Sequence, residues 1–590
     1  MNKYLKEGQK SNYDKYPVVQ VPGFECACTC GWEDILKELK KACEGLGYDT
    51  LVVECYQGVR DEEVTGALKA DFPNVPIYYS SDAMKSQERI YGILKEDITD
   101  DEVFGYMTSF TMEVYFDETK VGLMRSELAS DKAELKIVYG TGASYIVQGN
   151  SLLVYLDMAR WEIQMRFRRN EVSNVGFDNR DQRASLQYKQ AYFVDWRILD
   201  RWKKGIYGRI DYFIDTNEAD RPKMIPSGAF YAGMEEAVKR PFRVVPYFDP
   251  GVWGGQWMKE VFDLGKDKPN YAWCFDCVPE ENSLYLGFGD TRFETPSINV
   301  VFTHPVELLG PDVYGRFGDE FPIRFDLLDT MGGGNLSLQV HPLLEYIREK
   351  FGMDYTQEES YYLLDAGNDA CVYLGVKAGI RPEDMISDLE EASKTGRFDA
   401  GKYVGRYPVK KHDHVLIPPG TVHCSGANSM VLEISATPYI FTFKLWDWGR
   451  VGLDGRPRPI NIGHGSRVIQ WDRTEEWVRR EGINDIRPIA KGDGWEEERT
   501  GLHELEFIES RRHWFSKPVH LTTGGSVQVM NLVEGREAVV ESPSGAFEPF
   551  VVHYAETFII PAAVGEFIVR PYGESEGETI ATIKASVRKR

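Results

Sequence analysis

The sequence predicts a multidomain protein in which an N-terminal α/β domain with a parallel sheet precedes two β domains of the sandwich or jelly-roll type. Three observations predict this order. Apolar strands alternate with helices over residues 1–235, short β runs separated by proline and glycine dominate residues 236–498, and residues 499–590 repeat that β texture. A chain of 590 residues is too long for one core and corresponds to about three to four domains.

The composition of the chain indicates which binding partners and which cellular location to expect. The formal net charge of −23 argues against nucleic acid or an anionic membrane as a partner, because both require a basic face. The sequence contains no apolar run long enough to span a bilayer, and the polar start MNKYLKEGQK does not resemble a secretion signal. We therefore expect a cytoplasmic protein with reduced cysteines; the sequence leaves the oligomeric state open.

The first domain begins with an alternation of strand and helix. The apolar run YPVVQV (16–21) precedes a predicted helix over residues 32–47, which is followed by the strand DTLVVECY (49–56). Apolar residues recur in the helix at helical spacing: Ile35, Leu36, Leu39 and Cys43. This arrangement predicts a βαβ unit and hence a parallel sheet.

The order of strand, loop and helix resembles the start of P-loop kinases of the uridine kinase group. By this resemblance, the arginines of the segment 151–170 lie where such kinases carry an arginine-bearing lid helix; they are Arg160, Arg166, Arg168 and Arg169. The sequence CTCGW (28–32) stands where a working loop ends in Gly-Lys-Ser or Gly-Lys-Thr. We interpret the domain as a degenerate kinase whose helix N-terminus could still hold an anion. The alternative is an unrelated α/β domain with a basic, solvated helix.

The middle segment has the pattern of an antiparallel β domain with a helical insertion. Strands are predicted at four places: residues 361–366, 370–376, 414–420 and 430–436. Between the second and third strands, residues 381–396 read as a helix that begins near Pro382 and ends at Gly396.

The last segment contains a short sequence that repeats part of the middle segment. HVLIPPGTVH (414–423) aligns with TFIIPAAVGE (557–566), which places Pro418 on Pro561 and His423 on Glu566. The second copy keeps the strand and turn but not the histidine. This pattern indicates a duplicated β domain in which one copy retained a metal site.

Metal-ligand types gather in the middle segment, and all ten histidines lie at or beyond His304. Gln339 and His341 are two residues apart on a predicted strand, so their side chains share one face. A carboxylate of the pair Glu358 and Glu359, together with His423, completes a mixed nitrogen and oxygen set. Such a set suits zinc, with manganese, iron and cobalt left open.

These pieces resemble type I mannose-6-phosphate isomerases, which are cupins, over roughly residues 240–590. The resemblance extends to GVWGG (251–255) and FTFKLWDWGRVGLDGRPR (441–458). It implies a single divalent metal, zinc first, and a sugar or sugar phosphate as substrate. Its ligand set would be Gln339, His341, Glu359 (in preference to Glu358) and His423.

The same resemblance suggests catalytic residues and also shows departures. Lys444 and Glu433 are candidates for proton transfer or substrate contact, and Trp446 and Trp448 are candidates for stacking on a sugar. The family usually has an arginine at the position of Lys444, and a lysine where this chain has Gln357. The substrate is therefore mannose 6-phosphate, a related sugar phosphate or an unphosphorylated sugar.

Two other functions remain open on these grounds. One is a metal-binding sugar sensor that lost turnover, and the other is a bifunctional sugar kinase and isomerase.

The two histidines in KKHDH (410–414), His412 and His414, are interpreted as solvated.

Overall fold

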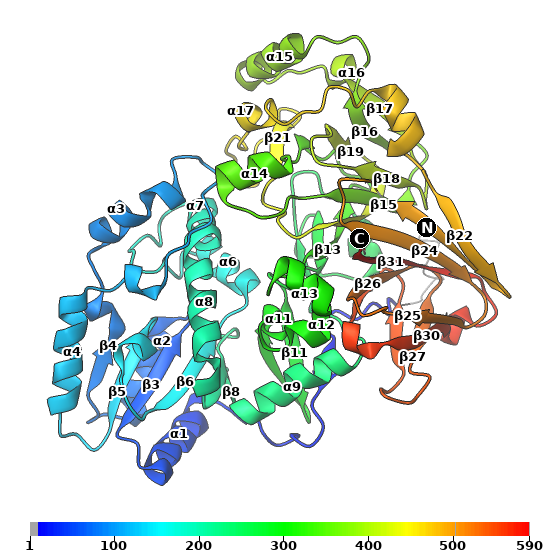
Figure 1. Cartoon of the computed structure of the whole chain (residues 1–590). Coiled ribbons are helices and arrows are strands. Elements are labelled where there is room, and N and C mark those ends of the chain that lie inside the picture. Colours follow the sequence, from blue (N-terminus) through cyan, green and yellow to red (C-terminus); the bar gives the residue numbers. More distant parts are fainter. Residues whose placement is uncertain (1–9, 502, 589–590) are drawn as a thin grey trace.

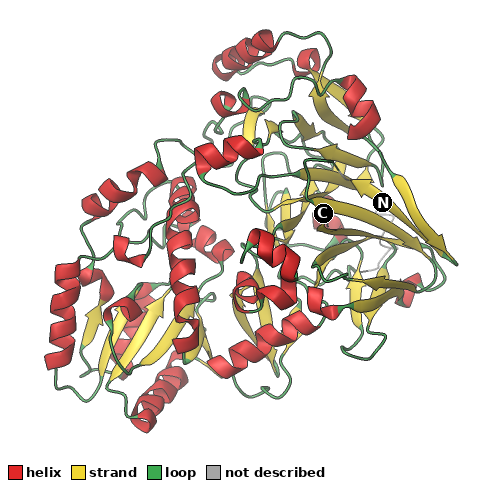
Figure 2. Ribbon diagram, viewed as in Figure 1, coloured by secondary structure: helices red, strands yellow, loops and turns green. Residues whose placement is uncertain are grey.

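The computed structural model describes residues 10–501 and 503–588. Figure 1 shows most of the N-terminal third, in blue to cyan, as a body beside strands from the middle and end of the chain, while its first, dark blue segment runs along the middle part. Figure 2 shows that many of the longer helices lie in this N-terminal body, whereas long strands dominate the rest.

The N-terminal body is built around a seven-stranded sheet in which five neighbouring strands run parallel. The sheet order is β2 (Thr29–Cys30), β8 (Lys223–Pro226), β7 (Tyr212–Asp215), β6 (Leu152–Asp157), β3 (Thr50–Cys55), β5 (Lys136–Gly140) and β4 (Ile77–Tyr79). Every residue of β3, β5 and β6 is buried. Burial on both faces explains why these strands read as continuous apolar runs.

Helices connect these strands, and one further helix follows the last of them. They are α1 (Trp32–Leu46), α2 (Asp61–Asp71), α3 (Gln87–Ile98), α4 (Glu118–Ser130), α5 (Ala143–Ile146), α6 (Arg160–Arg168), α7 (Ala184–Gln190), α8 (Trp196–Ile206) and α9 (Ser227–Lys239). The apolar face predicted for α1 is buried, and the helix ends at Gly47, whose left-handed φ of 69° suits glycine.

The βαβ unit predicted from residues 16–56 is wrong. Strand β1 (Val18–Gln20) pairs in parallel with β11 (Ser283–Phe288), which pairs antiparallel with β12 (Thr291–Pro296). The physical reason is its burial pattern: of its three residues only the central one is buried, and Gln20 is exposed. Such a strand suits a sheet edge rather than the all-apolar centre that β3 occupies.

The middle of the chain forms two sheets whose strand pairs are antiparallel. One has the order β18 (His414–Ile417), β15 (Glu359–Ala366), β20 (Ser429–Ala436), β13 (Ile323–Asp329), β10 (Trp273–Cys277) and β9 (Tyr247–Asp249). The other has the order β17 (Val404–Pro408), β16 (Cys371–Val376), β19 (His423–Ser425), β14 (Leu338–Val340) and β21 (Phe443–Trp446).

Helices accompany these sheets. The predicted insertion is α15 (Pro382–Thr395), which Gly396 closes in the left-handed conformation. The others are α10 (Trp257–Val261), α11 (Ile298–Thr303), α12 (Pro305–Leu309), α13 (Pro311–Phe317), α14 (Leu344–Phe351), α16 (Ala400–Tyr403), α17 (Ile462–Gly465) and α18 (Glu475–Trp477).

The end of the chain forms two further antiparallel sheets with an apolar cluster between them. One contains β22 (Arg487–Gly492), β23 (Trp495–Gly501), β24 (Ile508–Phe515), β31 (Ile580–Val587), β26 (Gln528–Glu534) and β29 (Thr557–Ile560). The other contains β25 (Val519–Thr522), β30 (Glu566–Pro571), β27 (Glu537–Glu541) and β28 (Phe550–His553). The boundaries predicted at 235 and 498 fall inside α9 and β23, and the division into domains stays a prediction.

A buried ionic network ties the three parts together. The Arg243 guanidinium lies 2.9 Å from a carboxylate oxygen of Glu556 and 3.3 Å from one of Asp276. The Tyr13 hydroxyl donates to the same Asp276 carboxylate at 2.5 Å. Residues from both ends of the chain therefore meet on one strand of the middle sheets, β10.

None of the helices in the described part of the chain is long and apolar enough to cross a membrane.

The interpretation of His412 and His414 as solvated is wrong. His414 is only 1% exposed and packs beside Gly501, because it begins a strand that is buried throughout. His412 is half-buried and lies 2.9 Å from the Glu534 carboxylate. Burial, and then the positive charge of Arg512, lower the pKa of His414 to about 3 from its ordinary 6.5.

We predict that His414 makes folding sensitive to mild acid. Below pH 6.5 the unfolded chain takes up a proton that the folded His414 does not, so stability falls as the pH falls. The loss for one such group approaches about 1.4 kcal/mol per pH unit, or about 2 kcal/mol at pH 5. Urea unfolding of wild type and His414→Gln between pH 7 and 5 measures it; the variant should lose less stability over this range.

The matched control is His520→Gln, because His520 is exposed. It should keep the wild-type pH dependence. Equal slopes for wild type and His414→Gln would contradict the assignment.

Candidate metal centre and adjoining cavity

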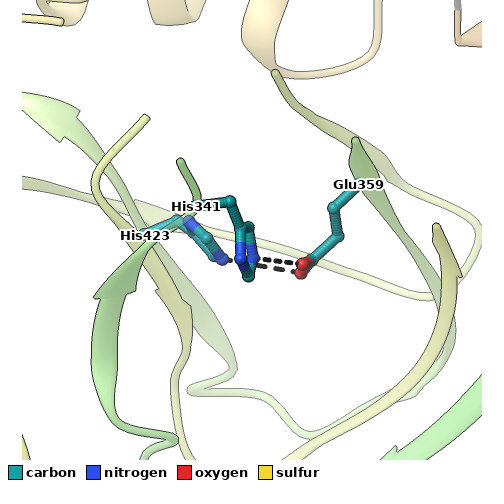
Figure 3. A group of neighbouring side chains, drawn as sticks. All are labelled: His341, Glu359 and His423. Atoms are coloured by element: carbon teal, nitrogen blue, oxygen red, sulfur yellow. Dashed lines mark ion pairs between the residues drawn. The ribbon is translucent and has the colours of Figure 1, made fainter. Parts of the chain in front are cut away.

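The predicted ligands meet between the two middle sheets. His341 directly follows β14 and His423 begins β19, and these neighbouring strands pair Gln339 with His423. Glu359 begins β15 in the opposite sheet. The three side chains point toward one another, as Figure 3 shows. The glycine turn before His423 at Gly420, with a φ of 83°, returns the chain toward the centre.

The ligand atoms converge closely. The Nε2 atom of His341 lies 2.5 Å from Oε2 of Glu359, and Nε2 of His423 lies 3.5 Å from Oε1 of the same carboxylate. The Gln339 amide nitrogen lies 3.3 Å from Nε2 of His423. Both histidines and Glu359 are almost fully buried.

Hydrogen bonds fix which histidine atoms face the centre. Nδ1 of His423 lies 2.8 Å from the Thr421 carbonyl, and Nδ1 of His341 lies 3.3 Å from that of Phe441. In each bond Nδ1–H donates, which leaves the Nε2 lone pair turned inward. Burial lowers the pKa of His341 despite the nearby Glu359, so this ring is neutral.

This geometry fits a divalent cation. The inward atoms are electron-pair donors, and within the described part of the chain Nε2 of His341 and Oε1 of Glu359 are buried without a hydrogen-bond partner. Acceptors brought so close repel unless a positive charge lies between them. The Gln339 amide can be turned to offer its oxygen as a fourth ligand, because the two orientations of an amide are nearly equivalent in shape. Glu358 instead accepts a hydrogen bond from the Phe507 N–H at a distance of 2.6 Å.

A cavity of about 260 Å³ adjoins the cluster and reaches Gln339. Both predicted catalytic residues, Lys444 and Glu433, line it, as does Gln357. Burial, and then the charge of Arg458, lower the pKa of Lys444 to about 8. The Gln357 amide donates to Glu359 at 3.2 Å, so this residue orients the candidate ligand.

Strand β13 adds two residues that sequence reasoning missed. Arg324 pairs with both Asp326, at 2.9 Å, and Glu433, and all three line the cavity. Glu433 is therefore held as an ion-paired carboxylate. Burial raises the pKa of Asp326 to about 7 although Arg324 opposes the shift. The signal in the sequence is the alternation in IRFDLLD (323–329), which places Arg324 and Asp326 on one face.

The two tryptophans proposed to stack on a sugar lie elsewhere. Trp446 is buried against Phe398, and Trp448 donates from its indole nitrogen to the Leu336 carbonyl. Neither is among the described residues that line the cavity. Tryptophans do line it, but they are Trp161, Trp253 and Trp273. Regular alternation along β21 would place Trp446 on the same face as Lys444, but the register of β21 against β14 shifts between these two residues, so the alternation is interrupted there.

The predicted basic helix is only partly solvated. Arg166 is fully buried and donates to the carbonyls of Gly58 and Thr216, while Arg160 is buried against Asp200. These arginines stabilise the fold, because their charges are matched by buried acceptors. Arg168 and Arg169 on the same helix are about 45% and 44% exposed.

The N-terminal body has its own cavity, of about 1030 Å³, which includes the loop after β3. In an open parallel sheet, ligands bind at the carboxyl ends of such strands. The equivalent of a phosphate loop is therefore expected at Tyr56–Arg60 and not at residues 28–32, because β1 lies outside this sheet. The following helix begins with three acids, Asp61, Glu62 and Glu63. Their charge disfavours phosphate there. The kinase resemblance stays a prediction.

Comparison with known proteins divides the chain in two. Residues 31–239 match a family model described as a domain of unknown function (DUF8485). Mannose-6-phosphate isomerase ManA of Bacillus subtilis is 24% identical over 343 residues, which cover 57% of this chain and 97% of that protein. The mannose-6-phosphate isomerase of Streptococcus mutans is 24% identical over 243 residues, covering 39% of this chain and 70% of that protein.

The crystal structure of mannose 6-phosphate isomerase from Bacillus subtilis superposes with a TM-score of 0.48 and 18% identity, over 59% of this chain and 99% of that one. Over about 57% of its length, the chain is homologous to mannose-6-phosphate isomerases.

Proposed function

We propose that the protein is a metal-dependent aldose–ketose isomerase that interconverts mannose 6-phosphate and fructose 6-phosphate or a closely related sugar pair. The observation that carries this proposal is the convergence of His341, Glu359 and His423 beside a sugar-sized cavity. The similarity to curated mannose-6-phosphate isomerases supports the same reaction class.

The proposed metal ligands are Gln339, His341, Glu359 and His423. A divalent ion held there, zinc by preference, would polarise the sugar oxygens at C1 and C2 and stabilise the negative charge of an enediol. The Glu359 carboxylate would offset part of the positive charge of the ion, and the two neutral imidazoles would donate lone pairs to it. Gln357 keeps Glu359 in place through its amide.

Proton movement between C1 and C2 falls to residues of the cavity. Asp326, with a pKa of about 7, can both accept and donate a proton near neutral pH. Glu433 is fixed beside it by Arg324. Lys444 also lines the cavity. Among the described residues, no carboxylate lies within 4 Å of its ammonium group, so Lys444 is available to donate to a substrate oxygen or a phosphate.

The other cavity arginines are already matched. Arg168 pairs with Asp249 at 2.9 Å and Arg458 pairs with Asp447 at 2.7 Å. A phosphate must therefore rely on Lys444 or compete with these carboxylates, which favours testing an unphosphorylated sugar alongside the phosphosugar. A metal-binding sugar sensor is the second candidate, because the same pairing would weaken substrate phosphate binding.

We predict that His423→Ala abolishes metal binding and activity together. Removing one imidazole leaves Glu359 and His341 as an incomplete set, and the lost charge stabilisation should lower kcat/KM by more than about a hundredfold. Metal content by elemental analysis and isomerisation of mannose 6-phosphate measure the two effects.

His412→Ala is the matched control, because His412 lies outside the ligand cluster. It should keep both metal and activity. Full metal occupancy in His423→Ala would remove this residue from the ligand set.

We predict that Lys444→Ala lowers kcat/KM by about 10- to 100-fold while metal content stays at the wild-type level. This range corresponds to the loss of one charge-assisted hydrogen bond. Lys444→Arg should retain more activity than the alanine variant, since it keeps the charge. An unchanged kcat/KM in Lys444→Ala would exclude the side chain from substrate binding and catalysis.

The substrate is tested by running mannose 6-phosphate and mannose in parallel on the metal-loaded protein. Turnover of the phosphosugar supports the proposed reaction, and turnover of mannose alone would restrict the enzyme to unphosphorylated sugars. Saturable sugar binding without turnover would favour the sensor.

A further inference from the structure

The cavity beside the metal centre is not built by the isomerase-like part alone. Four of its lining residues come from the N-terminal segment that matches a domain of unknown function: Trp161, Gln164, Arg168 and Tyr188. The first three lie on α6 and the last on α7. In Figure 1, α6 lies on the side of the N-terminal body that faces the middle strands.

These residues are locked onto the middle sheets. The Trp161 ring stacks on Tyr247 of β9, with centroids 3.7 Å apart and an angle of 13° between planes. The Arg168 guanidinium makes two 2.9 Å hydrogen bonds to Asp249 of the same strand. The hydroxyl of Tyr188 is hydrogen-bonded to that of Tyr439. The N-terminal wall is thus positioned by contacts at several points.

The chemistry of this wall suits a sugar. The Trp161 ring stacks on Tyr247 and has the Arg168 guanidinium 5.4 Å from its centroid. The part of the ring that these groups leave uncovered lines the cavity and presents apolar area to the C–H groups of a sugar, and the neighbouring Gln164 amide offers hydrogen bonds to its hydroxyls. The Gln164 amide nitrogen donates to Glu281 at 2.9 Å, which orients the amide. A volume of about 260 Å³ is at the small end of ligand sites and admits one sugar unit.

We infer that the N-terminal domain is a substrate-binding part of the isomerase: α6 and α7 form one wall of the sugar pocket, and Trp161 binds the ring of a monosaccharide or its phosphate. This inference rests on the proposed function for the identity of the reaction. It gives the domain of unknown function a role that does not require nucleotide binding.

The test compares Trp161→Ala with wild type in the full, metal-loaded chain. Steady-state isomerisation of mannose 6-phosphate and mannose gives kcat and KM, and calorimetry with the same sugars gives binding. Trp161→Ala should raise KM about tenfold, with metal content kept and a smaller change in kcat. Trp161→Phe should recover most of the affinity, which a loss of packing elsewhere would not predict.

Trp202→Ala is the matched control. Trp202 is a half-buried tryptophan of α8 in the same domain, and it contacts Ser144 and Tyr145 away from this cavity. It should leave KM unchanged. Thermal unfolding of each variant separates an effect on the pocket from an effect on folding.

The outcomes distinguish the two proposals. Turnover by wild type with an unchanged KM in Trp161→Ala would overturn the inference and leave the isomerase proposal intact. Sugar binding without turnover that is weakened by Trp161→Ala would support the inference that α6 and α7 bind the sugar, and it would contradict the proposed isomerase activity. Absence of both binding and turnover in wild type would overturn both.

Discussion

The repulsion between converging electron-pair donors is the constraint around which the middle of the chain is organised. Two sheets bring His341, His423 and Glu359 to one buried point, and backbone carbonyls hold both imidazoles with their Nε2 atoms inward. Without a cation, this cluster would be a cost to folding. With one, it links strands β15 and β19 of opposing sheets, so binding of the ion and stability of the fold are coupled.

Two kinds of charged residue surround the candidate metal centre: those held in ion pairs and Lys444. Around Glu433, Arg324 is compensated by Asp326 on its own strand and by Glu433 on the neighbouring strand, which fixes the side chains but leaves little net charge for a ligand. Lys444, by contrast, is half-buried, and burial together with Arg458 lowers its pKa to about 8. Gln357 orients Glu359 without adding charge to the cavity. Lys444 is a cavity cation for which the described residues show no carboxylate partner within 4 Å, so these two residues act differently on the candidate ligand and on an anionic substrate.

The sequence predicted what depends on local order and failed where distant segments pack. Strand alternation and the turn before His423 marked Gln339, His341 and His423 as candidate ligands, whereas the choice of Glu359 over Glu358 came from the resemblance to the isomerases. The helix ending at Gly396 follows from standard stop signals. The partner of β1 could not be predicted, because a three-residue edge strand carries too little pattern to select β11 over β3. The burial of His414 and Arg166 was missed because charged and polar side chains are usually exposed, whereas tertiary packing decides the exposure of these two. The wall at Trp161 has no local signal, since it exists only when α6 meets β9.

The separation of ligand set and pocket wall has a structural consequence. The candidate metal ligands all belong to the two middle sheets, whereas Trp161 and Tyr188 reach the cavity from another body through contacts to β9 and Tyr439. Strand β9 is the edge of its sheet and lies four strands from β15, which carries Glu359. A small displacement of the N-terminal body would therefore reshape this cavity while the candidate ligand cluster stayed intact. If this cavity binds the sugar, as we propose, ligand affinity and metal affinity are separable, and the N-terminal body acts on the first.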